Sequence, residues 1–172
     1  MNPQPPVTKR RIAARTSSDK GYVKGSHKNH EGHNGSRPSE NDIARAILDA
    51  AFLVHTKLGP GLLESVYEVV LAHELGERGF SVERQKPMSI VYDGIRFDEA
   101  FRADLVVNGK VTVELKSIDL LSTVHAKQLL TQLRLSALKL GLLINFGETH
   151  LKNGIKRVIN GQLEPETSNL VL

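Results

Sequence analysis

The 172-residue sequence contains no cysteine, so neither a disulfide framework nor a thiolate-ligated metal site can form. This absence suits a reducing compartment, and we expect a cytoplasmic protein. Long apolar runs are also missing. None approaches the roughly 18 residues of a membrane span and no signal-peptide core follows Met1, so we expect no membrane association. Aromatic residues make up only 5% of the chain, which argues against a surface that stacks single-stranded bases.

The net charge of +4 is distributed unevenly along the chain. Residues 1–40 hold eight Lys and Arg against three Asp and Glu, whereas the other 132 residues hold 15 against 16. Residues 1–38 are rich in Pro, Ser, Gly, Lys, Arg and His without apolar periodicity, and we predict a disordered basic tail there. An arm that binds nucleic acid, a targeting signal and an inert solvated tail are all compatible with this composition.

Residues 39–160 carry the apolar patterns of a folded domain, and residues 161–172 resemble a loosely attached C-terminal tail. Ser39 can cap a helix whose Asp42 lies in the first turn, where a negative charge suits the helix dipole. Gly59-Pro60-Gly61 cannot continue that helix, so we expect it to end there.

Beyond this break, the patterns predict a second helix over about residues 62–78, then strands, a third helix and two more strands. The strand-like runs are FSVERQ, MSIVYDG, IRFDEAFRADLVV, KVTVELKS, GLLINFG and GIKRVI, and the third helix is TVHAKQLLTQLRLSALKL. No internal repeat is visible. This order predicts an α/β (α+β) fold in which helices flank a mixed β-sheet.

The segment EAFRADLVVNGKVTVELKS, residues 99–117, combines an apolar strand pattern with three charged residues, Asp104, Glu114 and Lys116. Burying a charge without a partner is expensive, so charges in such a pattern need either a solvated face or a function. The pairing of the two strands decides which of these applies.

The turn between these strands contains Asn108-Gly109, and two pairings are conceivable. A two-residue turn would mix apolar with polar side chains on both faces of the hairpin. A three-residue loop instead pairs Val107 with Val111 and makes one face entirely apolar, which is the arrangement that folding favours. That register places Asp104 opposite Glu114 at a separation where two carboxylates repel.

A divalent cation would relieve this repulsion, so the register predicts a metal site at Asp104 and Glu114. The residue types alone allow a second interpretation equally well. Lys116 and Arg102 could neutralise the two acids as a solvated surface cluster.

The segment RADLVVNGKVTVELKS resembles the metal-binding hairpin of the PD-(D/E)XK nuclease superfamily, in which an Asp is followed by a hairpin and Glu-x-Lys. GLLESVY, with Gly61, Glu64 and Tyr67, is similar to the motif that names the GxxExxY family within that superfamily. ERQKPMSIVYDG, HAKQLL, LGLLINFG and LKNGIKR also resemble successive blocks of that family. The resemblance spans roughly residues 41–160 and implies a restriction-endonuclease-like fold.

The resemblance implies that Asp104, Glu114 and the backbone carbonyl of Leu115 ligate Mg²⁺ (or Mn²⁺). It also implies that Lys116 orients or activates the attacking water and stabilises the negative charge that develops on the phosphate. Ala103 precedes Asp104 where the superfamily's name has Pro, which leaves these ligands intact.

The same resemblance implies that Glu64 and Gln128 complete the catalytic site. Each has a structural alternative. Glu64 could complement a helix N-terminus, the stripe with Gln128 could be a solvated face, and Tyr67 suits the core better than the chemistry. Gln132 stands where we expect an aromatic residue, which puts substrate stacking there in question. Four further residues are candidate phosphate contacts or simply wet surface: His125, Lys152, Lys156 and Arg157.

The leading hypothesis from the sequence is therefore a Mg²⁺-dependent nuclease that hydrolyses phosphodiester bonds of DNA. One alternative is a nuclease-fold module that binds nucleic acid or a protein partner without cleaving. Another is a small α/β interaction protein whose acids bind only a structural ion.

Overall fold

The computed structural model describes residues 37–163, which lie within one compact unit of the chain. The predicted basic tail falls outside this range except for its last two residues, and so does most of the predicted C-terminal tail. The interpretations of both tails therefore stay predictions. Within residues 37–163, no helix is long and apolar enough to cross a membrane.

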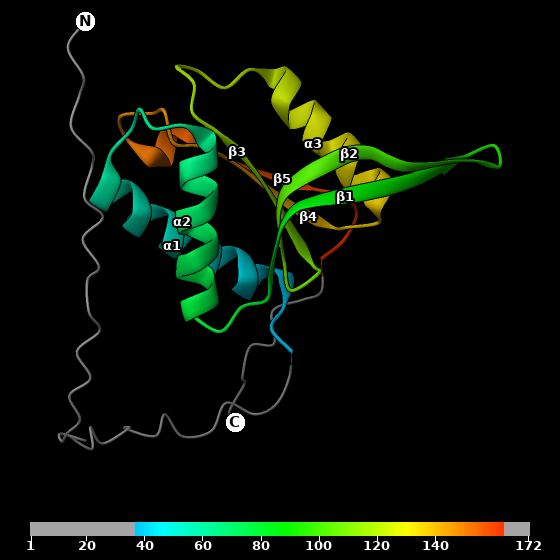
Figure 1. Ribbon diagram of the computed structural model, residues 1–172, viewed down its shortest axis with the longest axis horizontal. Coiled ribbons are helices and arrows are strands. Elements are labelled where there is room, and N and C mark those ends of the chain that lie inside the picture. Colours follow the sequence, from blue (N-terminus) through cyan, green and yellow to red (C-terminus); the bar gives the residue numbers. More distant parts are fainter. Residues whose placement is uncertain (1–36, 164–172) are drawn as a thin grey trace, which may run out of the picture. The chain divides into compact units, whose positions relative to one another are not determined.

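The described residues form one five-stranded sheet with helices against it (Figure 1). In chain order the elements are α1 (Glu40–Leu58), α2 (Glu64–Glu77), β1 (Val82–Tyr92), β2 (Ile95–Val107), β3 (Val111–Lys116), α3 (Thr123–Ser136), β4 (Leu140–Asn145), η1 (Leu151–Gly154) and β5 (Ile155–Ile159). The strand order is β1-β2-β3-β4-β5, and all neighbours are antiparallel except β3 and β4, which are connected through α3. The predicted α+β fold with a mixed sheet is confirmed.

Helix α1 begins where the sequence predicts, at a hydrogen-bonded N-cap. Ser39 Oγ accepts a hydrogen bond from the Asp42 N–H (3.2 Å), and the Asp42 carboxylate accepts one from the Ser39 N–H (3.1 Å). The apolar face that follows packs into the core, where Ile43 and Ile47 are fully buried. The helix ends at Gly59, whose φ of 70° favours glycine.

Two element boundaries differ from the prediction for physical reasons. The runs FSVERQ and MSIVYDG form a single strand, β1, that passes through Pro87. Proline lacks a backbone N–H group and cannot donate a hydrogen bond to a neighbouring strand. It is tolerated in β1 because β1 is an edge strand, with a neighbour on one side only. Helix α3 ends at Ser136, earlier than predicted, because Ala137 adopts a left-handed conformation and caps the helix.

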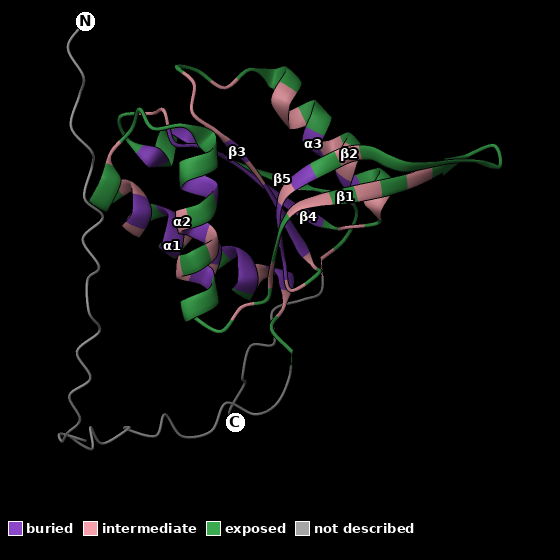
Figure 2. Ribbon diagram, viewed as in Figure 1, coloured by how far each residue is buried: buried purple, intermediate pink, exposed green. Residues whose placement is uncertain are grey.

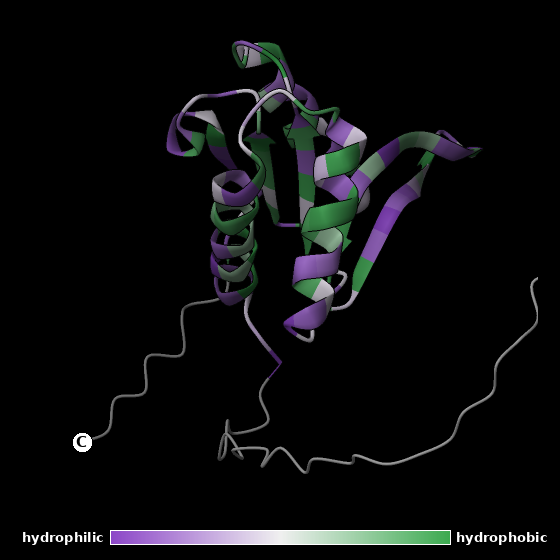
Figure 3. Cartoon of the chain, turned by 60° about the vertical axis from the view of Figure 1, so that its left-hand side comes forward, coloured by the Kyte–Doolittle hydropathy of each residue, from purple (hydrophilic) through white to green (hydrophobic). Residues whose placement is uncertain are grey.

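The main core lies between the sheet and the pair α1 and α2. Alternate residues of β3, namely Val111, Val113 and Leu115, belong to this core (purple in Figure 2). The strands between the helices are predominantly hydrophobic (Figure 3). Tyr67 of α2 and Phe146 stack within the core, with ring centroids 4.3 Å apart. Helix α3 lies against the opposite face of the sheet, so the two faces have separate coverings.

The β2–β3 hairpin adopts the register that the apolar pattern predicts. Val107 pairs with Val111 and Leu105 with Val113, and these side chains share the face that packs into the core. Asn108-Gly109 has positive φ at both residues, 50° and 65°, which is the backbone of a tight two-residue turn. That turn alone would pair Val107 with Lys110. The strands instead pair Val107 with Val111, which keeps the apolar residues on one face.

Strands β1 and β2 continue beyond the other strands as a two-stranded arm (Figure 1). Strand β3 pairs with β2 only at residues 105–107, so the outer part of β2 has a neighbour on one side only. Within the arm, Ile90 pairs with Phe97 and Tyr92 with Ile95. The outer side chains of the arm are exposed (green in Figure 2), which leaves this ribbon without a covering element.

The loop that follows β3 is held by Asn145 and Gly147. The Asn145 side-chain amide accepts a hydrogen bond from the Ile118 N–H (3.0 Å) and donates one to the Ile118 carbonyl (2.7 Å). A Cβ atom on Gly147 would lie only 2.4 Å from the same carbonyl oxygen. These contacts fix the chain two residues after Lys116, and so they position the end of β3.

Replacing Gly147 with Ala should lower the free energy of unfolding by about 1–3 kcal/mol, because the new methyl group meets backbone atoms of Ile118. The matched change Gly76→Ala in α2 meets no atom within 4 Å. It should raise that free energy by up to about 1 kcal/mol through helix propensity. Urea unfolding measures both, and effects of the same sign would contradict the described packing.

Candidate metal centre and active site

Two carboxylates, Asp104 and Glu114, meet on the β2–β3 hairpin. The register that pairs Leu105 with Val113 continues to place Asp104 across from Glu114. Asp104 Oδ2 accepts a hydrogen bond from the Leu115 N–H (2.8 Å), so the carboxylate is tied to the facing strand. The Glu114 side chain is only 19% exposed. The two acids are therefore held in a partly desolvated site.

The environment of Asp104 disfavours its negative charge. Burial is the largest cause that raises the pKa of Asp104 above its ordinary value of 3.8, and the charge of Glu114 raises it further. Hydrogen bonds from the Leu115 N–H and from Gln85, together with the charge of Lys116, lower the pKa without cancelling the rise. This site therefore favours a positive charge beside it.

Lys116 supplies a positive charge at the two acids. Its Nζ donates hydrogen bonds to Glu114 Oε1 (2.8 Å) and to the Leu115 carbonyl (2.9 Å). Burial disfavours the charged ammonium, but the hydrogen bond and the charge of Glu114 outweigh burial and raise the pKa of Lys116 above 10.5. The charges of Glu64 and Asp104 act in the same direction.

The oxygen atoms around the Lys116 ammonium group fit a divalent cation. The Glu114 carboxylate and the Leu115 carbonyl already contact a cationic group, and the Asp104 carboxylate lies beside them. Hard oxygen ligands of this kind suit Mg²⁺ and Mn²⁺. Within residues 37–163, three or more His, Cys, Asp or Glu side chains do not come together at any one place where they could share a metal ion. A cation here would rely on two carboxylates, one carbonyl and water.

Gln85 on β1 and Glu68 on α2 support Asp104, and sequence reasoning missed both. Gln85 Nε2 donates to Asp104 Oδ1 (3.3 Å) and to Glu68 Oε2 (2.6 Å). Gln85 has a φ of 47°, which is uncommon for any residue other than glycine. Glu68 is 5% exposed and pairs with Arg84 (2.8 Å). A strained residue and an ion pair whose acid is buried therefore adjoin Asp104.

Arg102 takes no direct part in neutralising the acid pair, contrary to the surface-cluster interpretation. Its guanidinium donates to the Glu99 carboxylate (2.9 Å from Nε) and to the Gln85 carbonyl (2.9 Å from Nη1). Only Lys116, of the two cations proposed for that role, hydrogen-bonds to one of the two acids.

Glu64 is the first residue of α2 and reaches the end of β3. Its Oε1 accepts a hydrogen bond from the Ser117 N–H (3.1 Å), and Ser117 Oγ donates to the Leu62 carbonyl (2.6 Å). Because the charge of Glu64 also raises the pKa of Lys116, the structure brings this acid to the same site.

Gly61 and Tyr67 shape the loop that presents Glu64. Gly61 has a φ of 98°, which an L side chain rarely adopts. The Tyr67 hydroxyl donates to the Gly59 carbonyl (2.6 Å) and accepts a hydrogen bond from the Leu62 N–H (3.2 Å). Tyr67 is fully buried, as expected of a core residue. Both residues act as a scaffold for the loop.

Helix α3 carries two predicted site residues, Gln128 and His125, and only Gln128 lies at the site. His125 caps the N-terminus of the helix. Gln128 lines the same pocket as Glu114. His125 Nδ1 accepts a hydrogen bond from the Ser122 N–H (3.2 Å) and so caps the helix N-terminus. His125 therefore has a structural partner, whereas Gln128 lies beside one of the predicted metal ligands.

The other candidate phosphate contacts lie apart from one another. Lys156 on β5 pairs with Leu143 on β4, and Leu143 pairs with Glu114 on β3. The Lys156 side chain therefore lies on the same face of the sheet as Glu114, two strands from it. Arg157 lies on the other face and donates to Asn41 of α1. Lys152 lies in η1. The structure does not bring these residues together as one phosphate-binding cluster.

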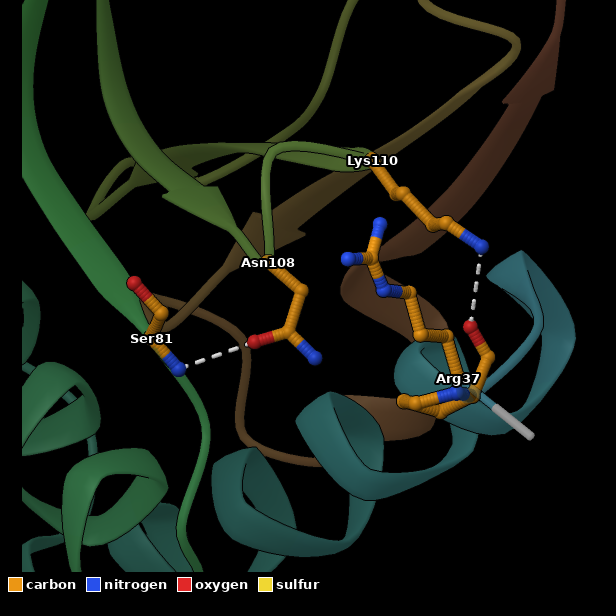
Figure 4. Close-up of a pocket in the computed structure, with 5 residues that line it drawn as sticks. Arg37, Ser81, Asn108 and Lys110 are labelled. Carbon is orange, nitrogen blue, oxygen red and sulfur yellow. Dashed lines mark hydrogen bonds between the residues drawn. The ribbon is translucent and has the colours of Figure 1, made fainter. Parts of the chain in front are cut away.

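A separate pocket of about 350 Å³ lies beside the turn of the hairpin, at the end away from Lys116 (Figure 4). Arg37, Ser81, Asn108 and Lys110 line it, together with Pro38, and no acidic side chain is among these residues. Lys110 Nζ donates to the Pro38 carbonyl (3.1 Å), and Asn108 Oδ1 accepts from the Ser81 N–H (2.8 Å). Without an acid, this pocket does not suit a divalent cation.

A family model described as the PD-(D/E)XK nuclease superfamily matches residues 41–158, which is most of the chain. The matched segment contains every strand of the sheet except the last residue of β5, together with the acid pair and Lys116. No curated protein and no solved structure matches the chain.

The Asp104 carboxyl should titrate above pH 3.8 in the metal-free protein. In Glu114→Gln its pKa should fall, because one like charge is removed. Carboxyl-carbon NMR titration of both proteins measures these values. A pKa at or below 3.8 in the parent would contradict the buried, facing arrangement.

The raised pKa of Asp104 also determines how the free energy of unfolding changes with pH. The folded protein holds the Asp104 proton more tightly than the unfolded chain does. The contribution of this carboxyl is therefore fully present below pH 3.8 and is lost as the pH rises through the folded pKa.

Proposed function

The chain belongs to the PD-(D/E)XK nuclease superfamily, and from that premise we propose that it is a metal-dependent nuclease that hydrolyses phosphodiester bonds of DNA. The observation that carries the proposal is the grouping of Asp104, Glu114, the Leu115 carbonyl and Lys116 on one hairpin. We propose Mg²⁺, or Mn²⁺ in its place, as the ion, and the cytoplasm as the place of action.

Asp104, Glu114 and the Leu115 carbonyl are the groups that would hold the ion. A bound divalent cation lowers the pKa of a water molecule and neutralises charge on the scissile phosphate. The hydrogen bonds of Asp104 to the Leu115 N–H and to Gln85 keep its carboxylate in a fixed orientation. Such preorganisation limits the rearrangement that ion binding requires.

Lys116 would compete with a bound ion for the same oxygen atoms. Its ammonium group bonds to Glu114 and to the Leu115 carbonyl, both of which are proposed ligands. With a divalent cation held by these oxygens, the Lys116 ammonium group would be free to lie beside the phosphate. There it would orient the attacking water and stabilise the negative charge that develops in the transition state.

Glu64 and Gln128 approach the centre from two different helices. Glu64, held by the Ser117 N–H, would bind a water molecule at the centre or accept a proton from it. Gln128 lines the pocket beside Glu114 and would contact the substrate. We also propose membership of the narrower GxxExxY family, with Gly61 and Tyr67 supporting the loop rather than taking part in the chemistry.

A module that binds nucleic acid or protein without cleaving is the competing function. The complete set of Asp104, Glu114 and Lys116 favours chemistry over this alternative, because a module that only binds has no need of a partly buried acid pair. A cleavage assay on linear, circular and branched DNA, with and without Mg²⁺ or Mn²⁺, separates the two functions. Binding without any metal-dependent cutting would favour the module.

Lys116→Met should reduce the rate of DNA cleavage by a factor on the order of 10² or more, because the transition state loses a positive charge. Metal affinity should hold or rise, since the ammonium group no longer competes for Glu114 and the Leu115 carbonyl. Single-turnover cleavage and calorimetric titration with Mn²⁺ measure the two effects.

Lys110→Met serves as the matched control, because Lys110 lies at the other end of the hairpin and its Nζ donates to the Pro38 carbonyl rather than to an acid of the site. It should cut at the parental rate. If Lys116→Met also cuts at that rate, the catalytic role of Lys116 is wrong. If its metal affinity falls, the competition between the two cations is wrong.

A further inference from the structure

A pocket of about 620 Å³ opens beside the proposed metal centre, between the arm and α3. Glu114 forms part of its wall, so the pocket is continuous with the centre. Ile90 and Phe101 line it from the arm, and Val124 and Leu135 line it from the helix. Apolar walls with a few polar groups are typical of a site that holds an organic ligand.

The polar groups of this pocket lie on α3. Gln128 and Gln132 are one helical turn apart, and both line the pocket. Gln132 Oε1 is buried and has no hydrogen-bond partner within residues 37–163. An unpaired buried acceptor is destabilising by about 1–3 kcal/mol, so a ligand that brings an N–H donor is favoured. Lys127 adds a positive charge that forms no ion pair in the described part of the chain.

The arm extends this pocket as an aromatic and apolar surface. Phe97 is the cross-strand partner of Ile90, and Tyr92 lies two residues beyond Ile90 and pairs with Ile95. All four side chains therefore occupy one face of the ribbon. Tyr92, Ile95 and Phe97 are 71%, 59% and 47% exposed, which is unusual for side chains of this size unless something covers them.

Aromatic residues are rare in this chain, but the fold gathers several of them along the pocket and the arm. The chain has three Tyr and five Phe, and three of these eight, Tyr92, Phe97 and Phe101, lie along the pocket and the arm. Successive levels of the ribbon face are about 6.8 Å apart, because every second residue points the same way. This is wider than the roughly 3.4 Å between bases stacked in a duplex strand, so bases here would be splayed.

We infer that this surface, formed by Phe101 in the pocket and by Tyr92, Ile95 and Phe97 on the arm, binds unpaired bases of a nucleic-acid strand. The inference rests on the proposed nuclease function, and it defines the substrate as a single strand or a duplex with an unpaired end or branch. Stacking on aromatic rings requires base faces that a duplex hides. The amides of Gln128 and Gln132 likewise suit base edges that are free only in an unpaired strand.

A second copy of the chain fits the same surface less well. Its apolar contact would also bury Glu114, Gln128 and Gln132, and polar groups that lack partners oppose burial. A nucleic-acid strand offers N–H donors to the amides and a phosphate to Lys127. The chemistry of the pocket therefore favours the strand.

Fluorescence anisotropy of the full chain in EDTA, where metal-dependent cleavage does not occur, tests this binding. The labelled probes are a short oligodeoxyuridine, the same strand annealed to oligodeoxyadenosine, and an oligouridine of equal length. We expect a single strand to bind more tightly than the duplex. The first and third probes differ only in the 2′-hydroxyl group, so the ratio of their affinities identifies the preferred sugar. A duplex bound as tightly as both single strands would overturn the inference.

Tyr92→Ala and Phe97→Ala should each weaken single-strand binding by about fivefold or more. Val91→Ala is the matched control, because Val91 is 69% exposed but pairs with Arg96 on the other face of the ribbon. It should leave the affinity unchanged. Equal losses in Val91→Ala and Tyr92→Ala would overturn the inference, and so would a dimer that Tyr92→Ala dissociates in size-exclusion chromatography.

The melting temperatures of these variants should match the parent, because the three side chains are exposed and outside the core. Failure of the nuclease proposal gives a different result. In that case the protein retains its preference for single strands in EDTA but cuts no probe after Mg²⁺ or Mn²⁺ is added.

Discussion

The pairing of β2 with β3 is the constraint on which the rest of the site depends. Leu105, Val113 and the other apolar residues of these strands can all enter the core in one register only, and a slip by one residue would turn them to the other face. The same register places Asp104 across from Glu114. The hydrophobic effect therefore holds two like charges together, and Lys116 compensates by bonding directly to one of them. A site that already binds one cation in this way is suited to exchange it for another.

The other elements of the fold hold the side chains and the loop that surround the two acids. Helix α2 contributes Glu64 through a loop held by the Tyr67 hydroxyl, and β1 contributes Gln85 in a left-handed backbone conformation. The loop after β3 is clamped by the buried Asn145. Strain and buried polar groups are destabilising, and they persist where the surrounding packing over-determines them. Here they gather around Asp104 and the end of β3, which are the places where the proposed function needs fixed positions.

The sequence was sufficient for features that follow from local chemistry and periodicity. Ser39 and Asp42 specify the start of α1, and the apolar alternation specifies the hairpin register. Other features depend on contacts between distant segments, which periodicity does not report. Gln85 has no apolar pattern to reveal that it reaches Asp104 from another strand. The low aromatic content argued against a stacking surface, yet the register within the arm collects Tyr92 and Phe97 on one face. Composition averages over a chain, whereas a surface depends on which residues meet.

We propose that Asp104, Glu114 and the Leu115 carbonyl form one binding site for a divalent cation. Anomalous X-ray scattering from crystals of the full chain soaked in Mn²⁺ tests this proposal. We expect a single strong peak within about 2.3 Å of an oxygen from each of the three groups, a distance typical of hard cations. We also expect the Lys116 ammonium group to have moved away from both Glu114 and the carbonyl. Crystals with no peak there, and with Lys116 still bonded to Glu114 at saturating Mn²⁺, would contradict it.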